Sequence, residues 1–158
     1  MNRIQDLLTH IDEIPVWIPV VLAIVVFIAI VGQWALYEKC GLPGYSSLVP
    51  VWNVITFLKI VGRPSKHGWY VMVPPVLMLI PIILWNFGYL GTIPAAGIVA
   101  VFFIPWAWFM VIVYKEICQC FGKFSIGSYA LIVIFNGIYL FNLALSQEEK
   151  YRGPVYKG

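Results

Sequence analysis

The chain has 158 residues, of which 61% are hydrophobic, 16% are aromatic and only 11% are charged. Soluble globular domains carry about a quarter of their residues as charged side chains, so this composition excludes a soluble domain. A helical membrane crossing needs roughly 20 apolar residues, which leaves room for one domain, residues 1–158, and no large extramembrane part. We therefore expect an all-α integral membrane protein.

The ten Lys and Arg residues outnumber the seven Asp and Glu residues and give a formal charge of +3. They are scattered over short loops, as in membrane topology signals, and form no basic patch of the kind that binds nucleic acid. We expect the lipid bilayer and other membrane subunits as partners. The three cysteines form no CxxC motif, and no cysteine or acid lies at ligand spacing from a histidine, so no metal or cofactor is expected.

The first apolar run, residues 14–37, is predicted to be a retained membrane helix. The preceding residues 1–13 carry Arg3 against three carboxylates, which is the reverse of the basic start of a signal peptide. Trp17 and Trp34 lie near the two ends of the run, where aromatic side chains mark the membrane interfaces.

Two short polar stretches are predicted to be loops. The first follows the initial helix and is dense in Gly, Pro and Ser, which predicts a turn built by Gly41, Pro43 and Gly44. The second contains Arg63, Pro64 and Lys66. We expect Arg63 and Lys66 to contact anionic headgroups or the carbonyls at helix ends.

Residues 48–62 form an apolar segment of 15 residues between these loops, too short to cross a bilayer comfortably. Pro50 lies near its start, and Asn53, Thr56 and Lys59 recur every three residues, so they form one polar stripe on a helix. This pattern favours a short helix in the plane of the membrane interface, with a re-entrant element as the alternative. Lys59 then reads as an interfacial lysine whose amine reaches water.

Three more apolar runs, residues 69–86, 93–114 and 125–145, bring the expected number of spans to about four. Prolines interrupt the backbone hydrogen bonds of the first of these runs, and Pro105 is predicted to break the second near its centre. Carbonyl groups freed in lipid need internal partners, so these helices are expected to be kinked and packed against neighbours. Small and polar residues in the last run suit close helix contact.

The distribution of Lys and Arg bears on orientation in the membrane. In a four-span arrangement the first and third loops hold six of the ten cations, which favours both termini outside the cytoplasm. Three of the other four cations lie in the tail after the last span. An odd number of crossings would place these three on the same side of the membrane as the six loop cations.

No catalytic constellation is visible, and we expect no enzyme activity. All seven carboxylates lie in tails or at helix ends, whereas proton-coupled pumps usually hold an ionisable group inside the membrane. The serines lie near loops or span ends, without a base at a spacing that would activate a nucleophile.

Two tryptophans, Trp106 and Trp108, fall near the middle of a predicted span rather than at an interface. They either present aromatic surface to a partner or a lipid, or pack internally beside Pro105, whose freed carbonyl at Val101 could accept an indole N–H. The amides within or beside apolar runs favour interhelical hydrogen bonds over a substrate site; they are Asn53, Asn86, Asn136 and Asn142.

Four blocks of sequence carry a family resemblance, and they read WALYEKCGLPGYSSLVPVWNVITFLKIVGRP, GW, CFGK and KYRGP. The pattern covers residues 33–154 and resembles a family of small bacterial membrane proteins of unknown function. It is also similar to the membrane domain that precedes the catalytic part of some Bacteroidota signal peptidases I. The resemblance implies a module of a bacterial inner membrane. It implies no proteolysis, because the serine–methionine pair and the catalytic domain of those enzymes are missing.

We therefore expect a non-catalytic subunit or accessory module of a larger membrane assembly, with protein export or signal-peptide processing as the context that the resemblance suggests. The alternative is a small transporter, channel or lipid-binding protein in which interrupted helices line a site. An intramembrane enzyme is a third reading.

Overall fold

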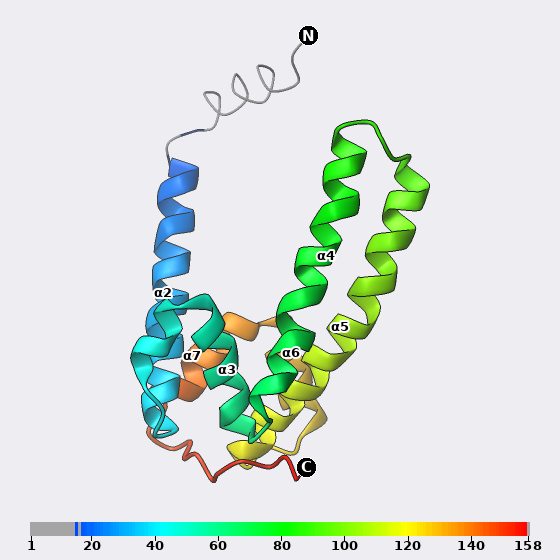
Figure 1. Ribbon diagram of the computed structural model, residues 1–158. Helices are drawn as coiled ribbons and strands as arrows, with labels where there is room; N and C mark the ends of the chain where they lie inside the picture. Colours follow the sequence, from blue (N-terminus) through cyan, green and yellow to red (C-terminus); the bar gives the residue numbers. More distant parts are fainter. Residues whose placement is uncertain (1–14, 16, 158) are drawn as a thin grey trace.

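A computed structural model describes residue 15 and residues 17–157 (Figure 1). These residues form helices and loops without a strand, which confirms the all-α fold. Three helices are long and apolar enough to cross a membrane, namely α2 (Trp17–Lys39), α4 (Gly68–Asn86) and α5 (Thr92–Cys120). The predicted charged tail, residues 1–13, and the start of the first span at residue 14 lie outside the described residues.

The predicted short helix is α3 (Pro50–Val61), which follows the 3-10 helix η1 (Gly44–Leu48) and leads through η2 (Ser65–His67) into α4. Pro50 occupies the first turn, where its missing N–H costs no hydrogen bond. The helix ends at Gly62, whose φ of 88° favours glycine. In both figures α3 runs more along the spanning helices than across them, an orientation that suits the re-entrant alternative better than the interfacial one.

The break predicted at Pro105 is wrong, because α5 continues through it as one helix of 29 residues. Likewise α4 continues through Pro74, Pro75 and Pro81. The two helices lie side by side as a hairpin, so one can supply the hydrogen bonds that a proline of the other removes (Figure 1). α5 also extends six residues beyond the predicted span, as far as Cys120.

The expected fourth span is divided into α6 (Ile126–Ile134) and α7 (Asn136–Leu145), which meet at an angle of 115°. Phe135, between them, has φ −111° and ψ 37°, outside the helical region. α7 packs on α2 beside Gly32, where an added Cβ would come within 2.7 Å of the Phe141 ring. The lack of a side chain at that position therefore allows the close approach of the two helices.

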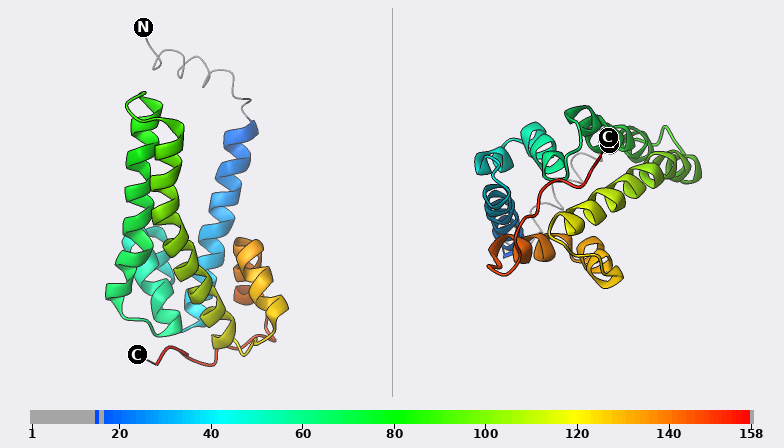
Figure 2. Two further views of the ribbon diagram at one scale, coloured as in Figure 1. Left: turned by 90° about the vertical axis from the view of Figure 1, so that its right-hand side faces the viewer. Right: turned by 90° about the horizontal axis from the view of Figure 1, so that it is seen from below.

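The pair α6–α7 begins and ends at the same end of the molecule (Figure 2). Lys123, before α6, forms an ion pair with Glu149, after α7. Lys39, at the end of α2, donates to the carbonyl of Ser146 at 2.6 Å. The ends of the bent pair α6–α7 are therefore held together at one end of the molecule, as they are in a re-entrant loop.

We call this end the base. It comprises residues 32–71 and 109–157, which include η1, α3, η2, α6, α7 and the segment 146–157. The main buried cluster of the described residues lies here and joins these elements, with fully buried side chains such as Leu36, Leu58, Ile117 and Ile132. The segment 146–157 crosses beneath the helices (Figure 2).

The opposite half consists of two separate arms, residues 17–31 of α2 and residues 72–108 of the α4–α5 hairpin. No Cα atom of α2 comes within 8 Å of a Cα atom of α4 or α5. The arms expose large apolar side chains along most of their length, as helices in contact with lipid do.

The base also carries the charge. Of the ten Lys and Arg residues, Arg3 lies outside the described residues, and the other nine all lie in the base. Between Lys66 and Lys115 no residue is charged. Trp17 and the segment 146–157 lie at opposite ends (Figure 1). Three helices are long and apolar enough to span, and the bent pair of the fourth apolar run counts as a further span if it crosses as one unit, which agrees with the expected number of about four.

Candidate functional site

The centre of the base is an ion pair between Arg63 and Glu116. The Arg63 Nε lies 2.7 Å from Glu116 Oε2, and Nη2 lies 2.7 Å from Oε1, so the contact is bidentate. The two side chains are only 10% and 14% exposed. The guanidinium also lies over the rings of Tyr156 and Phe109, at 4.7 and 5.0 Å from their centroids.

This pairing corrects the expectation that Arg63 contacts lipid headgroups or helix-end carbonyls. Because α5 continues past residue 114, Glu116 lies on a helix that faces the loop after α3. The hydrogen bonds that Arg63 donates to Glu116 raise the pKa of Arg63 above its ordinary value, against the opposing effect of burial. Lys66, three residues on, is exposed and has no ion pair or hydrogen bond among the described residues, so its headgroup contact stays a prediction. Pro64 precedes η2 in extended conformation.

Asn53 joins α3 to α2. Its side-chain amide donates to Gln33 Oε1 at 2.8 Å, and its oxygen accepts a hydrogen bond from Tyr37 Oη. The same hydroxyl lies 3.0 Å from the Asn53 carbonyl. Asn136 makes an equivalent link between α7 and α5, since its amide donates to Tyr114 Oη. Both asparagines therefore make the interhelical bonds that their positions indicated.

These amides also line an open chamber of about 160 Å³ in the base. Asn53 lies in the first turn of α3 and Asn136 begins α7, so the N-terminal ends of two short helices meet there. Gln33 and Tyr114 complete its polar lining. The Asn136 Oδ1 is buried and has no hydrogen-bond partner within the described residues. The chamber therefore offers uncharged donors and acceptors to a small polar molecule.

The predicted turn is built by the residues that indicated it. Gly41 has φ +72° and ends α2, where the Leu42 N–H donates to the Tyr37 carbonyl at 2.8 Å. Gly44 lies against Trp34, whose ring atoms would be 2.4 Å from an added Cβ. Pro43 precedes η1 in extended conformation.

Trp106 and Trp108 have different environments. The Trp106 Nε1–H donates to the carbonyl of Val71 at 3.1 Å. In a regular helix that carbonyl would accept from residue 75, but residue 75 is proline and has no N–H. Trp106 therefore donates a hydrogen bond to the α4 carbonyl that Pro75 leaves without a donor. The expectation that the Val101 carbonyl of α5 is the acceptor is wrong. Trp108 is 70% exposed on the outside of α5.

A groove of about 460 Å³ runs between α4 and α5 above the ion pair. His67 lies at its lower end, with Nδ1 3.5 Å from Arg63 Nη1 and its ring edge-on to Phe109. Prolines and aromatic side chains form the remaining walls. The groove is therefore apolar along the arms and polar where it meets the base.

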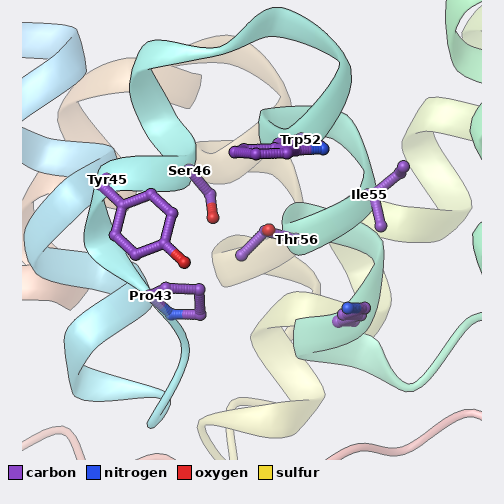
Figure 3. A pocket seen from close by; sticks show the side chains of 7 residues that line it. Pro43, Tyr45, Ser46, Trp52, Ile55 and Thr56 are labelled. Atoms are coloured by element: carbon purple, nitrogen blue, oxygen red, sulfur yellow. The ribbon is translucent and has the colours of Figure 1, made fainter.

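Lys59 lies on the outer face of α3 and is exposed. It borders a smaller pocket between η1 and α3 together with Pro43, Trp52 and three hydroxyl side chains (Figure 3).

Sequence reasoning missed Glu116, Gln33 and Tyr114 as members of the site. Gln33 carried a usable signal, because it is the one amide within the first apolar run, residues 14–37. Glu116 resembled an ordinary charge at the end of a span, so nothing in the local pattern pointed to Arg63. Comparison of the chain with protein-family models, with curated proteins and with solved structures gives no match.

Proposed function

We propose that this protein is a non-enzymatic membrane module that docks into a larger membrane assembly through its arms. The observation that carries the proposal is the separation of α2 from α4 and α5, none of whose Cα atoms lie within 8 Å of it. Helices in lipid gain stability by packing against one another, and here the three spans do not complete a bundle. A helix of another protein can supply that packing.

The groove between α2 and α7 favours a transmembrane helix as the occupant. It has a volume of about 340 Å³, and Ala29 and Gly137 leave room for close backbone approach. Its other lining residues are apolar. The arms carry no charge, so the fitting partner is an apolar helix with small residues on one face.

Orientation follows from the charge of the base. Cytoplasmic ends of membrane proteins are enriched in Lys and Arg, and nine of the ten lie in the base. The proposed arrangement places the base in the cytoplasm, with the bacterial inner membrane and protein export as the setting that the family resemblance suggests.

The test is site-specific photo-crosslinking in native membranes. A photoreactive residue at Ile28 or Ile138, both exposed at the groove, should crosslink to one and the same polypeptide, and Gly137→Leu should abolish both products by filling the groove. A probe at Trp108, on the outside of α5, is the control and should not give that product. Crosslinks at Ile28 and Ile138 to lipid alone would refute the proposal.

A second candidate function is passage or binding of a small uncharged solute, which the polar chamber favours. Half-helix ends beside an uncharged polar pocket are a feature of transporter sites. Purified protein in liposomes should then speed the entry of glycerol or urea, and Asn136→Leu should remove the effect. Equal entry rates with and without protein would exclude this function.

A further inference from the structure

The pocket between η1 and α3 is independent of the arms and of the proposed docking. It has a volume of about 200 Å³. Figure 3 shows the hydroxyls of Ser46 and Thr56 pointing toward one another across it, with Tyr45 to one side and the Trp52 indole above. The 3-10 helix η1 and α3 therefore bring three hydroxyl groups to one place.

These hydroxyls lack partners in the protein. Ser46 is 3% exposed and Thr56 is 5% exposed, yet neither side-chain oxygen has a hydrogen bond to any of the described residues. Tyr45 is 55% exposed, and its hydroxyl is equally unpaired within residues 15 and 17–157. Neither Ser46 Oγ nor Thr56 Oγ1 is among the fully buried oxygens, so both can be reached from the pocket and can donate to a ligand that accepts hydrogen bonds.

Lys59 adds a positive charge that no carboxylate of residues 17–157 offsets. Glu116 is paired with Arg63, and Glu149 is paired with Lys123. Glu38 accepts from the Trp34 indole at 2.6 Å. None of the pocket's lining residues is acidic, and Lys59 has no ion pair in the described part of the chain. The pocket therefore combines one free ammonium group with three free hydroxyl donors.

The surroundings of the pocket are apolar. Trp52 and Ile55 form part of its wall, and Leu48, Val49 and Val51 beside it are exposed. An anion that enters from water alone gains nothing from this surface. An anion that carries acyl chains gains the burial of those chains against it.

We propose that this pocket binds the phosphate ester of an anionic phospholipid. The phosphate oxygens accept hydrogen bonds from Ser46, Thr56 and Tyr45, and the Lys59 ammonium neutralises the charge. Trp52 covers the glycerol backbone, as interfacial tryptophans do. The acyl chains then lie along the exposed face of α3.

The test measures lipid bound per chain for the protein in phosphatidylcholine nanodiscs that contain a graded fraction of phosphatidylglycerol. Lys59→Ala should lower the affinity for phosphatidylglycerol at least about fivefold, the effect of one cation near a membrane surface. Thr56→Val, which keeps the shape of the side chain and removes the hydroxyl, should also lower the affinity for phosphatidylglycerol. Lys157→Ala is the matched control, since Lys157 is also exposed and has no ion pair among the described residues, and it should change the affinity less than twofold.

A competition arm distinguishes a lipid from a soluble phosphate. Glycerol 3-phosphate added in excess should fail to displace phosphatidylglycerol, because it lacks the acyl chains. Displacement by glycerol 3-phosphate would overturn the lipid assignment. Equal losses for Lys59→Ala and Lys157→Ala would also overturn the proposal, because they would reduce the effect to general surface charge.

Discussion

The base and the arms are both rich in apolar residues, but they are stabilised differently. In the base, segments distant in sequence are joined by polar contacts, such as the Arg63–Glu116 pair and the bond from the Tyr156 N–H to the Val61 carbonyl at 2.9 Å. In the arms, the polar contacts run only between neighbours in the hairpin. Trp85 donates to Thr92 at 3.1 Å, and Trp106 donates to Val71.

The difference shows where this protein obtains a defined tertiary structure. In lipid, apolar surface gives no strong force for helix association, so unique packing depends on close fit and on polar contacts. The base has both. The arms have them only within the α4–α5 hairpin, and α2 is left to contact lipid or a partner. Substitutions should therefore have larger effects on stability in the base than in the arms.

The largest effect is expected from Arg63→Ala. It leaves the largely buried Glu116 carboxylate without a partner, and breaking a buried pair typically costs about 3–5 kcal/mol. Unfolding in mixed micelles, followed by circular dichroism, measures the loss. The double variant Arg63→Met with Glu116→Leu should recover most of it, because no charge is then left unpaired. An Arg63→Ala protein as stable as Lys66→Ala would contradict the role of the pair.

Gly62→Ala should be the next most damaging change, with Gly88→Ala as its matched control. Both glycines have positive φ, 88° and 79°, so both variants carry backbone strain of about 1 kcal/mol. At Gly62 the new Cβ would lie 2.7 Å from Pro154 Cβ, whereas at Gly88 no atom lies within 4 Å. Only Gly62→Ala should therefore also release segment 146–157 to protease. Equal cleavage of the two variants would show that the segment is held elsewhere.

Trp106→Phe should lower stability by about 1 kcal/mol, because the Val71 carbonyl then loses its donor. Trp108→Phe, at an exposed position on the same helix, should have little effect. In a Pro75→Ala background residue 75 regains an N–H that can donate to Val71, so the cost of Trp106→Phe should shrink. A cost that is unchanged in that background would mean that Trp106 acts through packing alone.

The smallest effect is expected from the exposed pair of Lys123 and Glu149, below about 1 kcal/mol. The hydrogen bond from Lys123 to Glu149 raises the pKa of Lys123. The stabilisation by this ion pair is present in full below the ordinary pKa of lysine. It is lost as the pH rises through the raised pKa of Lys123 in the folded protein. The difference in melting temperature between the natural protein and Lys123→Met should therefore narrow from about pH 9 to pH 12. A constant difference would assign the effect to packing of the side chain.

The periodic and compositional features of the sequence predicted the helices well. Long apolar runs gave α2, α4 and α5 to within a few residues at most ends, because burial in lipid depends on local composition. Gly41 and Gly62 marked real helix ends for the same local reason.

What the sequence did not reveal depends on contacts between distant segments. The bend at Phe135 lies in a run that is apolar enough to span, and it is set by packing against α2 and α5. Pro105 failed to break α5, since helix context outweighed the local rule. The partner of Arg63 lies 53 positions away, and the partner of the Val71 carbonyl lies 35 away. No local pattern contains such pairings.

The segment 146–157 has a consequence for how the protein is made. It follows every membrane helix in the chain, and its backbone N–H groups at Arg152 and Tyr156 bond the end carbonyls of α5 and α3. During synthesis all the apolar helices can therefore enter the bilayer before the base is complete. Until then Arg63 also lacks the Tyr156 ring. A chain that is inserted but not yet closed by this segment is the form that membrane proteases and chaperones encounter, so its docking sets how long that form persists.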